Sequence, residues 1–257
     1  MKTKNKPIIP GQRVLLSLAI VLTQAGMFPE QSRAANAGPP SRQTVKVLMF
    51  GDSVTAGGMP AAVEAALNER TKGRVTWACV NAGVGGETAE GGKTRVAALL
   101  DKERPDIVTV SYGLNDTWLK HGTERFVKNM GEIVSIIRAH AAAPKIVLLT
   151  TTPLDDRRHF LAKEQYYIDQ GGPDRVLETQ YNDATRQLAV RGKLPLIDVH
   201  KHFLSAKEPM KNILPDGVHL NADGYKLIGP FVAGPLAAWY GKEAKSKSAA
   251  AQARTPP

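Results

Sequence analysis

The chain has 257 residues, enough for one large domain or two small ones, and 42% of them are apolar and 23% charged. This composition is typical of a soluble globular protein and excludes a largely disordered chain. The formal net charge is +10, but residues 1–37 and 242–257 hold nine Lys or Arg against two Glu, so the central part is only mildly basic. It has no dense stripe of Lys and Arg, which argues against nucleic acid as a partner.

Residues 1–37 have the pattern of an export signal. A cationic start precedes the uncharged, mostly apolar run "VLLSLAIVLTQAGMF" at 14–28, and Ala35-Asn36-Ala37 supplies small residues for cleavage. We expect cleavage near Ala37 and a secreted or periplasmic protein with no stable membrane span afterwards. The apolar run is short for a span of ~20 residues, and an uncleaved anchor is the alternative. No Cys follows the run at the cleavage region, so lipid attachment is not expected.

After a Pro/Gly/Ser-rich linker at 38–44, strand-like apolar runs alternate with helix-like segments. In chain order we predict a strand at 45–50, a helix at 60–70, a strand at 74–80, a helix at 93–102, a strand at 106–112, a helix at 123–140, a strand at 145–151, a helix at 175–191, a strand at 194–199 and a helix at 222–240. A polar loop is expected at about 153–172. Pro230 and Pro235 should kink or split the last helix, and the basic tail at 242–257 has the composition of a disordered segment.

Five apolar strands alternating with helices predict an open parallel sheet covered on both faces, a three-layer α/β/α sandwich. The crossover connections should be right-handed. In such sheets ligands bind beyond the carboxyl ends of the strands. The residues that follow the strands are therefore the first candidates for a functional site.

Four polar, turn-rich clusters lie next to strand ends or before the last helix. They are "GDS" (51–53), "NAGVGGET" (81–88), "GLND" (113–116) and "DGVH" (216–219). Each alone is typical of an ordinary turn, cap or loop. The second lacks both the Lys-Ser/Thr of a P-loop and the glycine spacing of a dinucleotide fingerprint. In this order and together, the four supply different parts of one catalytic site.

The chemistry of these clusters is complementary. Serine is a weak nucleophile until a base removes its proton, and His219 is a candidate base for Ser53. Asp216, three residues before His219, can accept from the other ring nitrogen and select the tautomer. The oxyanion needs donors, and the Ser53 N–H, an N–H of the "GVGG" turn and the Asn115 side-chain amide are candidates.

Taken together, these four motifs resemble those of the SGNH hydrolases, also called GDSL-type esterases and lipases. The family blocks correspond to "FGDSVTAG", "NAGVGGET", "YGLND" and "DGVHLNADGY", which extend over residues 47–225. The resemblance implies a flavodoxin-like sheet of five parallel strands and a hydrolase domain at 45–241. It also implies a serine hydrolase without a GxSxG elbow, and no GxSxG occurs in the chain. No cofactor is expected.

By position in the family blocks, the resemblance implies a catalytic Ser-His-Asp triad of Ser53, His219 and Asp216. It further implies an oxyanion hole formed by Ser53, Gly86 and Asn115. Gly86 is the glycine of its block that precedes an acidic residue and Thr. Val54 stands where the family usually has Leu or Ile, an apolar exchange that should not disturb the chemistry.

The substrate is expected to be chosen by the variable segments 117–124 and 153–175. Arg157, Arg158 and Tyr166 would suit a sugar or an acidic polymer, although a solvated loop is the alternative. We therefore favour short-acyl, acetyl-like esters of carbohydrates over long-chain lipids. A lysophospholipase or acyl-thioesterase, an acyl transferase, and a non-catalytic carbohydrate-binding protein on the same scaffold remain as alternatives.

Several other polar residues have simpler interpretations. The lone cysteine, Cys79, cannot form an internal disulfide and is expected to be a small buried group. His200 and His202 lack a second ligand cluster, so no metal site is predicted. Asp198 ends a strand and is the alternative candidate for the acid of the triad. His159 is a candidate substrate contact.

Overall fold

In the computed structural model, five parallel strands form one sheet within the residues that the structure describes, which are 44–72, 74–120 and 122–252. The strand order is β2-β1-β3-β4-β5. The predicted export signal at 1–37, its cleavage near Ala37, and all of the linker but Thr44 lie outside the described residues. The strands are β1 (Thr44–Gly51), β2 (Thr76–Gly83), β3 (Ile107–Ser111), β4 (Lys145–Leu149) and β5 (Leu196–Ile197).

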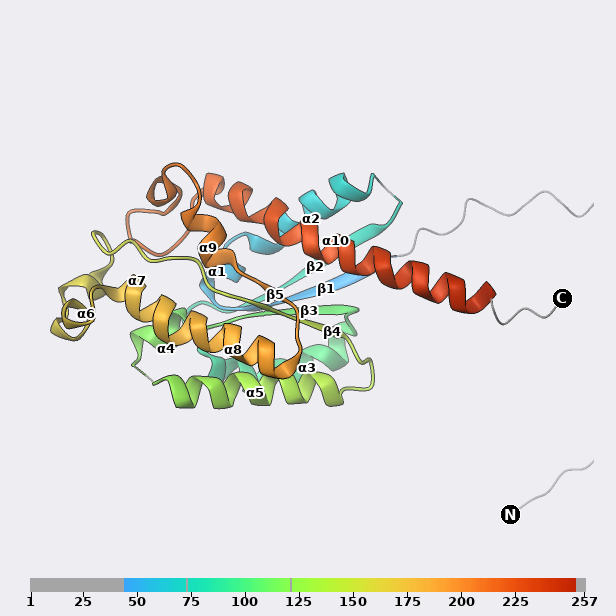
Figure 1. Cartoon of the computed structure of the whole chain (residues 1–257), viewed down its shortest axis with the longest axis horizontal. Coiled ribbons are helices and arrows are strands. Elements are labelled where there is room, and N and C mark those ends of the chain that lie inside the picture. The colour runs from blue at the N-terminus through green and yellow to red at the C-terminus, as the bar shows by residue number, and fades with distance from the viewer. Residues whose placement is uncertain (1–43, 73, 121, 253–257) are drawn as a thin grey trace, which may run out of the picture. The chain divides into compact units, whose positions relative to one another are not determined.

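Helices cover both faces of the sheet (Figure 1). On one side lie α2 (Met59–Thr71) and α10 (Ala222–Gln252), and on the other α3 (Ala89–Glu103), α5 (Thr123–Ala139) and α8 (Asp183–Gly192). The predicted three-layer α/β/α sandwich with a five-stranded parallel sheet is therefore confirmed. Among the helices that the structure describes, none combines the length and apolar character that a membrane crossing needs.

The sequence explains why these segments form the core. β1 is buried from Val47 to Gly51, as expected for a central strand with helices on both faces. In α5 the buried side chains recur at helical spacing and face the sheet, because one stripe of the helix is apolar. They include Phe126, Met130, Ile133 and Ile137.

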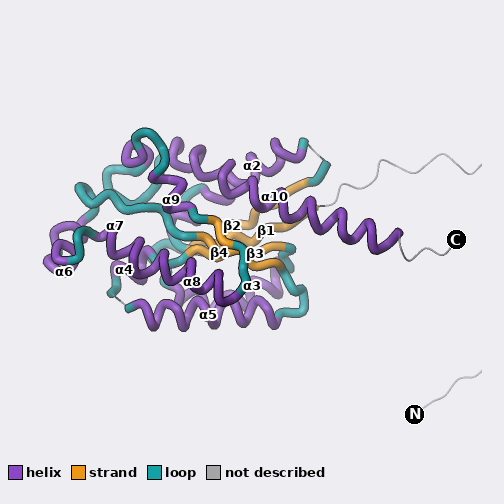
Figure 2. Tube along the Cα trace, viewed as in Figure 1, coloured by secondary structure: helices purple, strands orange, loops and turns teal. Residues whose placement is uncertain are grey.

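Short helical segments occupy the connections at the carboxyl end of the sheet (Figure 2). The predicted polar loop at 153–172 contains two of them, and the predicted helix at 175–191 is unbroken, with one π-helical turn between two α-helical parts. The short segments are α1 (Ser53–Ala56), α4 (Leu114–Trp118), η1 (Phe160–Lys163), α6 (Gln165–Asp169), α7 (Pro173–Val176), the π-helical η2 (Leu177–Asn182), α9 (Val199–Leu204) and η3 (Pro209–Asn212).

Several element bounds differ from the sequence prediction by a few residues, and the last strand and the last helix differ most. The last strand is only Leu196–Ile197, because the Asp198 side chain accepts the Lys201 N–H and so starts α9. The last helix is one continuous element, so of the kink or split expected at Pro230 and Pro235 the split does not occur.

The same helix continues to Gln252, through most of the segment predicted to be a disordered tail. The stretch "KEAKSKSAAAQ" is rich in Ala and Lys, which are among the best helix formers. Upstream, an apolar stripe of α10 is fully buried and holds the helix in place despite its prolines. This stripe is Ile228, Val232, Ala233 and Leu236.

Candidate active site

The ends of three neighbouring strands, β2, β1 and β3, align at one edge of the sheet. In the register, Gly51 of β1 is opposite Gly83 of β2 on one side and Ser111 of β3 on the other. The chain moves from β1 to one neighbour and then crosses to the other, so the switch point of the sheet lies at the end of β1. The loop that begins with Asp52 and Ser53 occupies this position.

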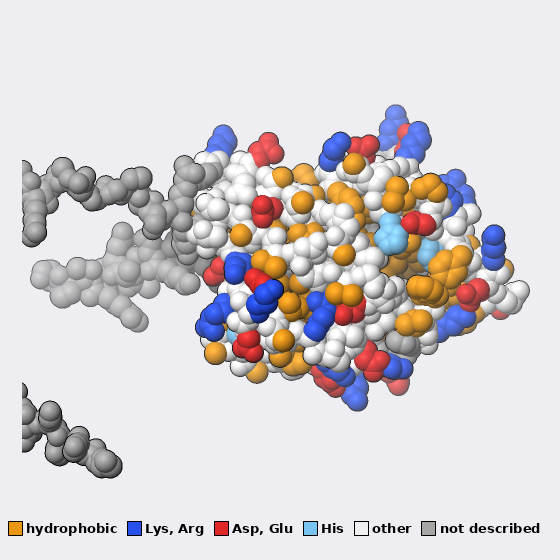
Figure 3. All heavy atoms as spheres, turned by 180° about the vertical axis from the view of Figure 1, so that it is seen from behind, with side chains coloured by type: hydrophobic (Ala, Val, Ile, Leu, Met, Phe, Trp, Pro, Cys, Tyr) orange, Lys and Arg blue, Asp and Glu red, His pale blue; other side chains and the backbone are white. Residues whose placement is uncertain are grey.

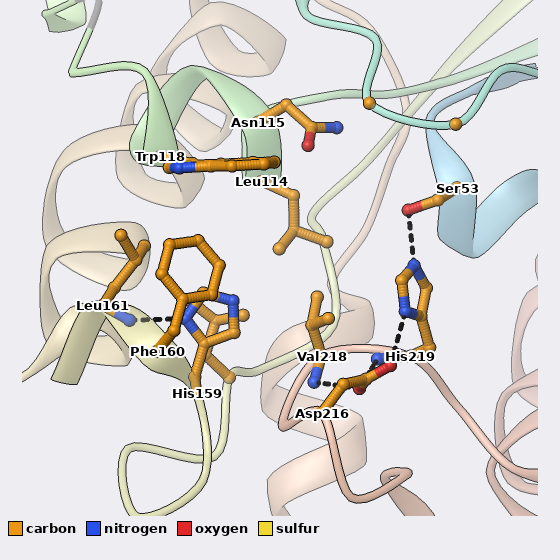
Figure 4. Close-up of a pocket in the computed structure, with 13 residues that line it drawn as sticks. Ser53, Leu114, Asn115, Trp118, His159, Phe160, Leu161, Asp216, Val218 and His219 are labelled. Atoms are coloured by element: carbon orange, nitrogen blue, oxygen red, sulfur yellow. Dashed lines mark hydrogen bonds and ion pairs between the residues drawn. The ribbon is translucent and has the colours of Figure 1, made fainter.

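The Ser53 side chain is placed by the start of α1. Asp52 is the N-cap residue, and its Oδ1 accepts the Val54 N–H at 3.0 Å. Ser53 is therefore the first helical residue, and its Oγ lies 3.0 Å from Nε2 of His219 (Figure 4). The Nδ1 atom of His219 lies 2.8 Å from Oδ2 of Asp216. The three predicted triad residues thus form one continuous chain of hydrogen bonds.

Asp216 is held as a carboxylate by its own loop. Its Oδ1 accepts the backbone N–H groups of Val218 at 2.9 Å and His219 at 3.0 Å, which leaves Oδ2 for the imidazole. Partial burial raises the pKa of Asp216, but these hydrogen bonds and the His219 ring outweigh it, so the pKa lies below its usual value. Asp198, the alternative acid, instead pairs with Arg186 at 2.8 Å.

Gly217 lets the loop of Asp216 and His219 approach the neighbouring segment. Its φ of +78° favours glycine, and a Cβ there would lie 2.5 Å from the His159 backbone nitrogen. The Gly217 carbonyl also accepts the Asp155 N–H at 2.8 Å. The segment from Asp155 to His159 is therefore fixed against the loop that carries the imidazole of His219.

The predicted oxyanion residues lie on the other side of Ser53. Gly86 has a φ of +75°, a left-handed conformation that favours glycine. Asn115 lies in α4, and its Nδ2 donates to the Glu87 carbonyl at 3.0 Å, which orients the amide beside Gly86. Gly86, Asn115 and Ser53 all line one cavity.

A largely buried ionic network supports this turn, and no sequence pattern predicted it. The Glu87 carboxylate receives the Arg95 guanidinium and the Tyr112 hydroxyl, the latter at 2.6 Å. Arg95 also donates to the Ala82 carbonyl at 2.8 Å and lies over the Phe50 ring, 4.5 Å from its centroid. The guanidinium therefore ties the turn after β2 to residues of β1 and to Tyr112 after β3.

Two buried carboxyl groups, Asp52 and Asp116, lie beneath the site. Burial raises the pKa of Asp52 to about 7 and that of Asp116 to about 6. Hydrogen bonds from the backbone of Val54 and Ala89 oppose the two shifts. Within the described residues, Asp52 Oδ2 and Asp116 Oδ1 have no hydrogen-bond partner, which favours the protonated form of each group.

The cavity beside Ser53 has a volume of about 360 Å³ and mainly apolar walls. The Trp118 and Phe160 rings meet edge to face with centroids 5.2 Å apart, and both are about half exposed. Hydrophobic side chains accordingly gather beside histidine on one face of the molecule (Figure 3). Four of the six apolar wall residues come from the segments expected to choose the substrate, 117–124 and 153–175, although none was singled out from the sequence. The walls are Leu114, Trp118, Leu154, Phe160, Leu161 and Val218.

The three predicted substrate contacts do not line this cavity. Arg158 binds the Asp155 carboxylate at 2.7 Å and the carbonyls of Met210 and Ile213, so it fastens its own loop. Arg157 is largely exposed and pairs with the same carboxylate. Tyr166 packs edge to face on its neighbour, Tyr167, with centroids 5.0 Å apart. Charge and aromaticity in the sequence could not distinguish these roles from substrate binding.

The other residues that could act as a nucleophile or a metal ligand, Cys79, His200 and His202, make other contacts. Burial raises the pKa of the Cys79 thiol to about 12, and the Glu64 charge adds to this, so the thiol stays protonated. His200 lies between Asp174 and Glu178, and His202 stacks on Phe231. Among the described residues, no group of three or more His, Cys, Asp or Glu is arranged to hold a metal ion.

Comparisons with known proteins identify the family of the chain. The sequence model of the GDSL-like Lipase/Acylhydrolase family matches residues 49–227. The uncharacterized lipoprotein YqeF of Bacillus subtilis is 26% identical, over 75% of this chain and 89% of that protein. An arylesterase of Vibrio mimicus is 24% identical, over 76% of this chain and 90% of that protein.

The fold is also similar to that of a solved lipase/acylhydrolase from Enterococcus faecalis. The TM-score is 0.61 and the sequence identity 23%, with 76% of this chain and 96% of that chain covered. The family model spans more than half of the sequence and includes the residues that meet at the edge of the sheet. The chain therefore belongs to the GDSL-like lipase/acylhydrolase family and is an esterase of the SGNH type.

Proposed function

We propose that this esterase is an exported serine hydrolase that cleaves carboxylic esters through an acyl-enzyme on Ser53. The observation that carries the proposal is the hydrogen-bonded series from Ser53 Oγ through His219 to Asp216. His219 Nε2 takes the Ser53 proton as Oγ attacks the ester carbonyl carbon. Because Asp216 accepts from Nδ1, the tautomer with a free lone pair on Nε2 is favoured.

The remaining steps return every group to its starting state. The C–O bond to the alcohol breaks, and the imidazolium of His219 gives its proton to the departing oxygen. Water then gives a proton to His219 and attacks the acyl carbon. The carboxylic acid leaves as Ser53 Oγ regains a proton. Asp216 stabilises the imidazolium in both halves without itself being protonated.

The negative charge that develops on the carbonyl oxygen needs fixed donors. We assign this role to the backbone N–H groups of Ser53 and Gly86 and to the Asn115 amide. The bond from Asn115 to the Glu87 carbonyl uses one of its two N–H groups and leaves the other for the oxyanion. Such donors are already oriented before reaction, so they cost little reorganisation.

The cavity walls favour an ester with an apolar group over a polar sugar. A sugar ring would need partners for several hydroxyl groups, and the cavity offers mainly Leu, Val and aromatic carbon. An apolar acyl or aryl group would instead gain roughly 25 cal/mol for each Å² that it buries. We therefore revise the expected substrate from short-acyl carbohydrate esters to esters of apolar acids or aryl alcohols.

A fluorophosphonate probe tests the mechanism directly. It labels only an activated serine, so the protein should be labelled and the folded Ser53→Ala variant should not. The same pair is then assayed on 4-nitrophenyl acetate, butyrate and octanoate, phenyl acetate, an acetylated xylo-oligosaccharide and an acyl thioester. Labelling of Ser53→Ala at the wild-type rate would remove Ser53 from the mechanism. Lack of labelling of the wild-type protein would favour the non-catalytic binding protein.

Export is part of the proposal, with cleavage near Ala37. The sequence supports it, and one relative is described as a lipoprotein. The only Cys of this chain is Cys79 of β2, which cannot serve as a lipid attachment site after a signal. Mass spectrometry of the exported protein should find Gly38 at its N-terminus. A protein that still began at Met1 would contradict the cleavage.

A further inference from the structure

One polar group of the cavity has no role in the proposed mechanism. His159 is only 6% exposed, lies at the cavity wall and comes from the segment fixed against Gly217. Its Nδ1 accepts the Leu161 N–H at 3.3 Å, which caps η1. Because that nitrogen uses its lone pair as an acceptor, the proton of the neutral ring is on Nε2.

The His159 ring is neutral at neutral pH. Burial lowers its pKa, and this outweighs the opposing effect of the Asp216 carboxylate, while the nearby His219 adds to the lowering. The ring lies against Phe160, with centroids 4.6 Å apart and an angle of 30° between the planes. His159 therefore presents a fixed neutral donor and not a cation.

The backbone of this segment is held by several bonds. The His159 N–H donates to the Asp155 carbonyl at 2.9 Å, and the Asp155 N–H donates to Gly217. Arg158 joins the same turn to the carbonyls of Met210 and Ile213. The position of the imidazole relative to His219 is thus set by the loop packing, as precise recognition of a substrate requires.

Figure 4 shows the Nε2 side of the His159 ring directed into the cavity, toward the space beside Leu114 and Val218. No hydrogen bond joins this nitrogen to another described residue. The neighbouring walls are aliphatic or aromatic. An N–H group in such surroundings gains from an acceptor on the ligand and is left unpaired by a purely apolar one.

We propose that the Nε2–H of His159 is a specificity-determining donor for substrate. The preferred substrate is an ester whose apolar part carries a hydrogen-bond acceptor, such as a ketone or ether oxygen, several atoms from the scissile carbonyl. This inference rests on the proposed function of the same site. The acceptor belongs to either the acyl chain or the alcohol, and the experiment separates the two sources.

The experiment compares esters of equal shape that differ in one acceptor. In the acyl arm, 4-nitrophenyl hexanoate is compared with its 3-oxo, 4-oxo and 5-oxo analogues, each corrected for spontaneous hydrolysis. In the alcohol arm, hexyl acetate is compared with oxohexyl acetates by titration of the released acid. We expect at least one oxo ester to be preferred about 10-fold in kcat/KM, the discrimination typical of one hydrogen bond to a neutral donor.

Two variants isolate the donor. His159→Ser keeps a cap for η1, since serine is a good N-cap residue, but its hydroxyl does not extend to the ring's Nε2 position. His159→Asn keeps the cap and retains an N–H donor on a shorter side chain. The oxo preference should fall to about 1 in the serine variant and be partly retained in the asparagine variant. The preference is a ratio of two substrates on one protein, so loss of folded protein cancels.

The tautomer gives a second readout that does not depend on turnover. In ¹⁵N spectra of the folded Ser53→Ala variant, His159 should show Nε2 protonated at pH 7, and the preferred oxo ester should shift this signal more than its apolar analogue. Equal rates for every matched pair in both arms, or an oxo preference unchanged in His159→Ser, would overturn the proposal. Failure to hydrolyse any ester would instead overturn the proposed function, and this inference with it.

Discussion

The Nε2 atom of His219 lies 3.0 Å from the Oγ of Ser53, although the two residues are 166 positions apart in the chain. Several bonds near the start of α10 fix this distance. The Tyr225 hydroxyl donates to the Val54 carbonyl at 3.1 Å, and the Leu214 N–H donates to the His219 carbonyl at 2.7 Å. The helix that follows His219 is thereby attached to the short helix that begins with Ser53.

The first prediction concerns the acid of the triad. Asp216→Asn should lower kcat about 10³- to 10⁴-fold, because an amide facing Nδ1 no longer favours the tautomer whose Nε2 accepts the Ser53 proton. KM should change little. The measurement is steady-state hydrolysis of 4-nitrophenyl butyrate, with circular dichroism to verify folding.

Asp198→Asn is the matched control for that variant. Asp198 pairs with Arg186 and caps α9, so its replacement should cost stability while kcat on the folded protein stays near the wild-type value. The reverse result, a large loss of kcat with Asp198→Asn and none with Asp216→Asn, would make Asp198 the functional acid.

The order of elements could be predicted from sequence because it depends on local patterns. Continuous apolar runs such as 146–149 and the helical spacing in α5 are visible without any tertiary information. The positions of Ser53 and Asn115 also follow once the strands are parallel, because parallel strands end at one edge, whereas His219 follows no strand and lies just before α10. Short motifs at strand ends therefore contain many of the candidate site residues.

The ion pair of Arg95 with Glu87, the cavity walls and the role of Arg158 depend on tertiary contacts that sequence spacing does not encode. Arg95 looks like an ordinary surface residue of a helix, yet its guanidinium is directed to Glu87, next to Gly86 in the turn after β2. Trp118 and Phe160 form one wall although they lie on different connections. The charge of Arg158 predicts a substrate contact, because the sequence does not show that its guanidinium binds the carbonyls of Met210 and Ile213.

The second prediction concerns the oxyanion hole. Asn115→Ala should lower kcat about 10²- to 10³-fold with little change in KM, since the lost donor acts on charge that develops only in the transition state. The Michaelis parameters of a short 4-nitrophenyl ester measure this. A rise in KM at constant kcat would show that Asn115 binds the ground state instead.

The third prediction concerns the network beneath the turn. Arg95→Met should destabilise the protein by about 3 kcal/mol or more in urea unfolding, because it leaves the largely buried Glu87 carboxylate without its cation. The double variant Arg95→Met, Glu87→Gln removes both charges and should recover part of that loss. Equal stability of the single and double variants would show that the charge of Glu87 does not matter.

The fourth prediction uses Asp52, whose pKa burial raises from 3.8 to about 7. Between these values the folded state keeps a proton that the unfolded state releases. Stability therefore falls as pH rises through this window and becomes constant above about pH 7. Asp116, raised to about 6, contributes in the same direction. The two groups together predict a protein that loses stability between pH 4 and pH 7.

The Asp52→Asn variant separates the contribution of Asp52 to this pH-dependent loss of stability from that of Asp116. Asparagine can still cap α1 through its carbonyl oxygen, but it has no charge to bury. One pKa unit corresponds to about 1.4 kcal/mol. The free energy of unfolding of the variant should therefore rise relative to that of the wild type by up to about 4 kcal/mol from pH 4 to pH 8. Urea midpoints measured at both pH values test this. A difference that stayed constant with pH would mean that Asp52 is ionised in the folded protein, and that the unpaired Oδ2 has found a cation or solvent.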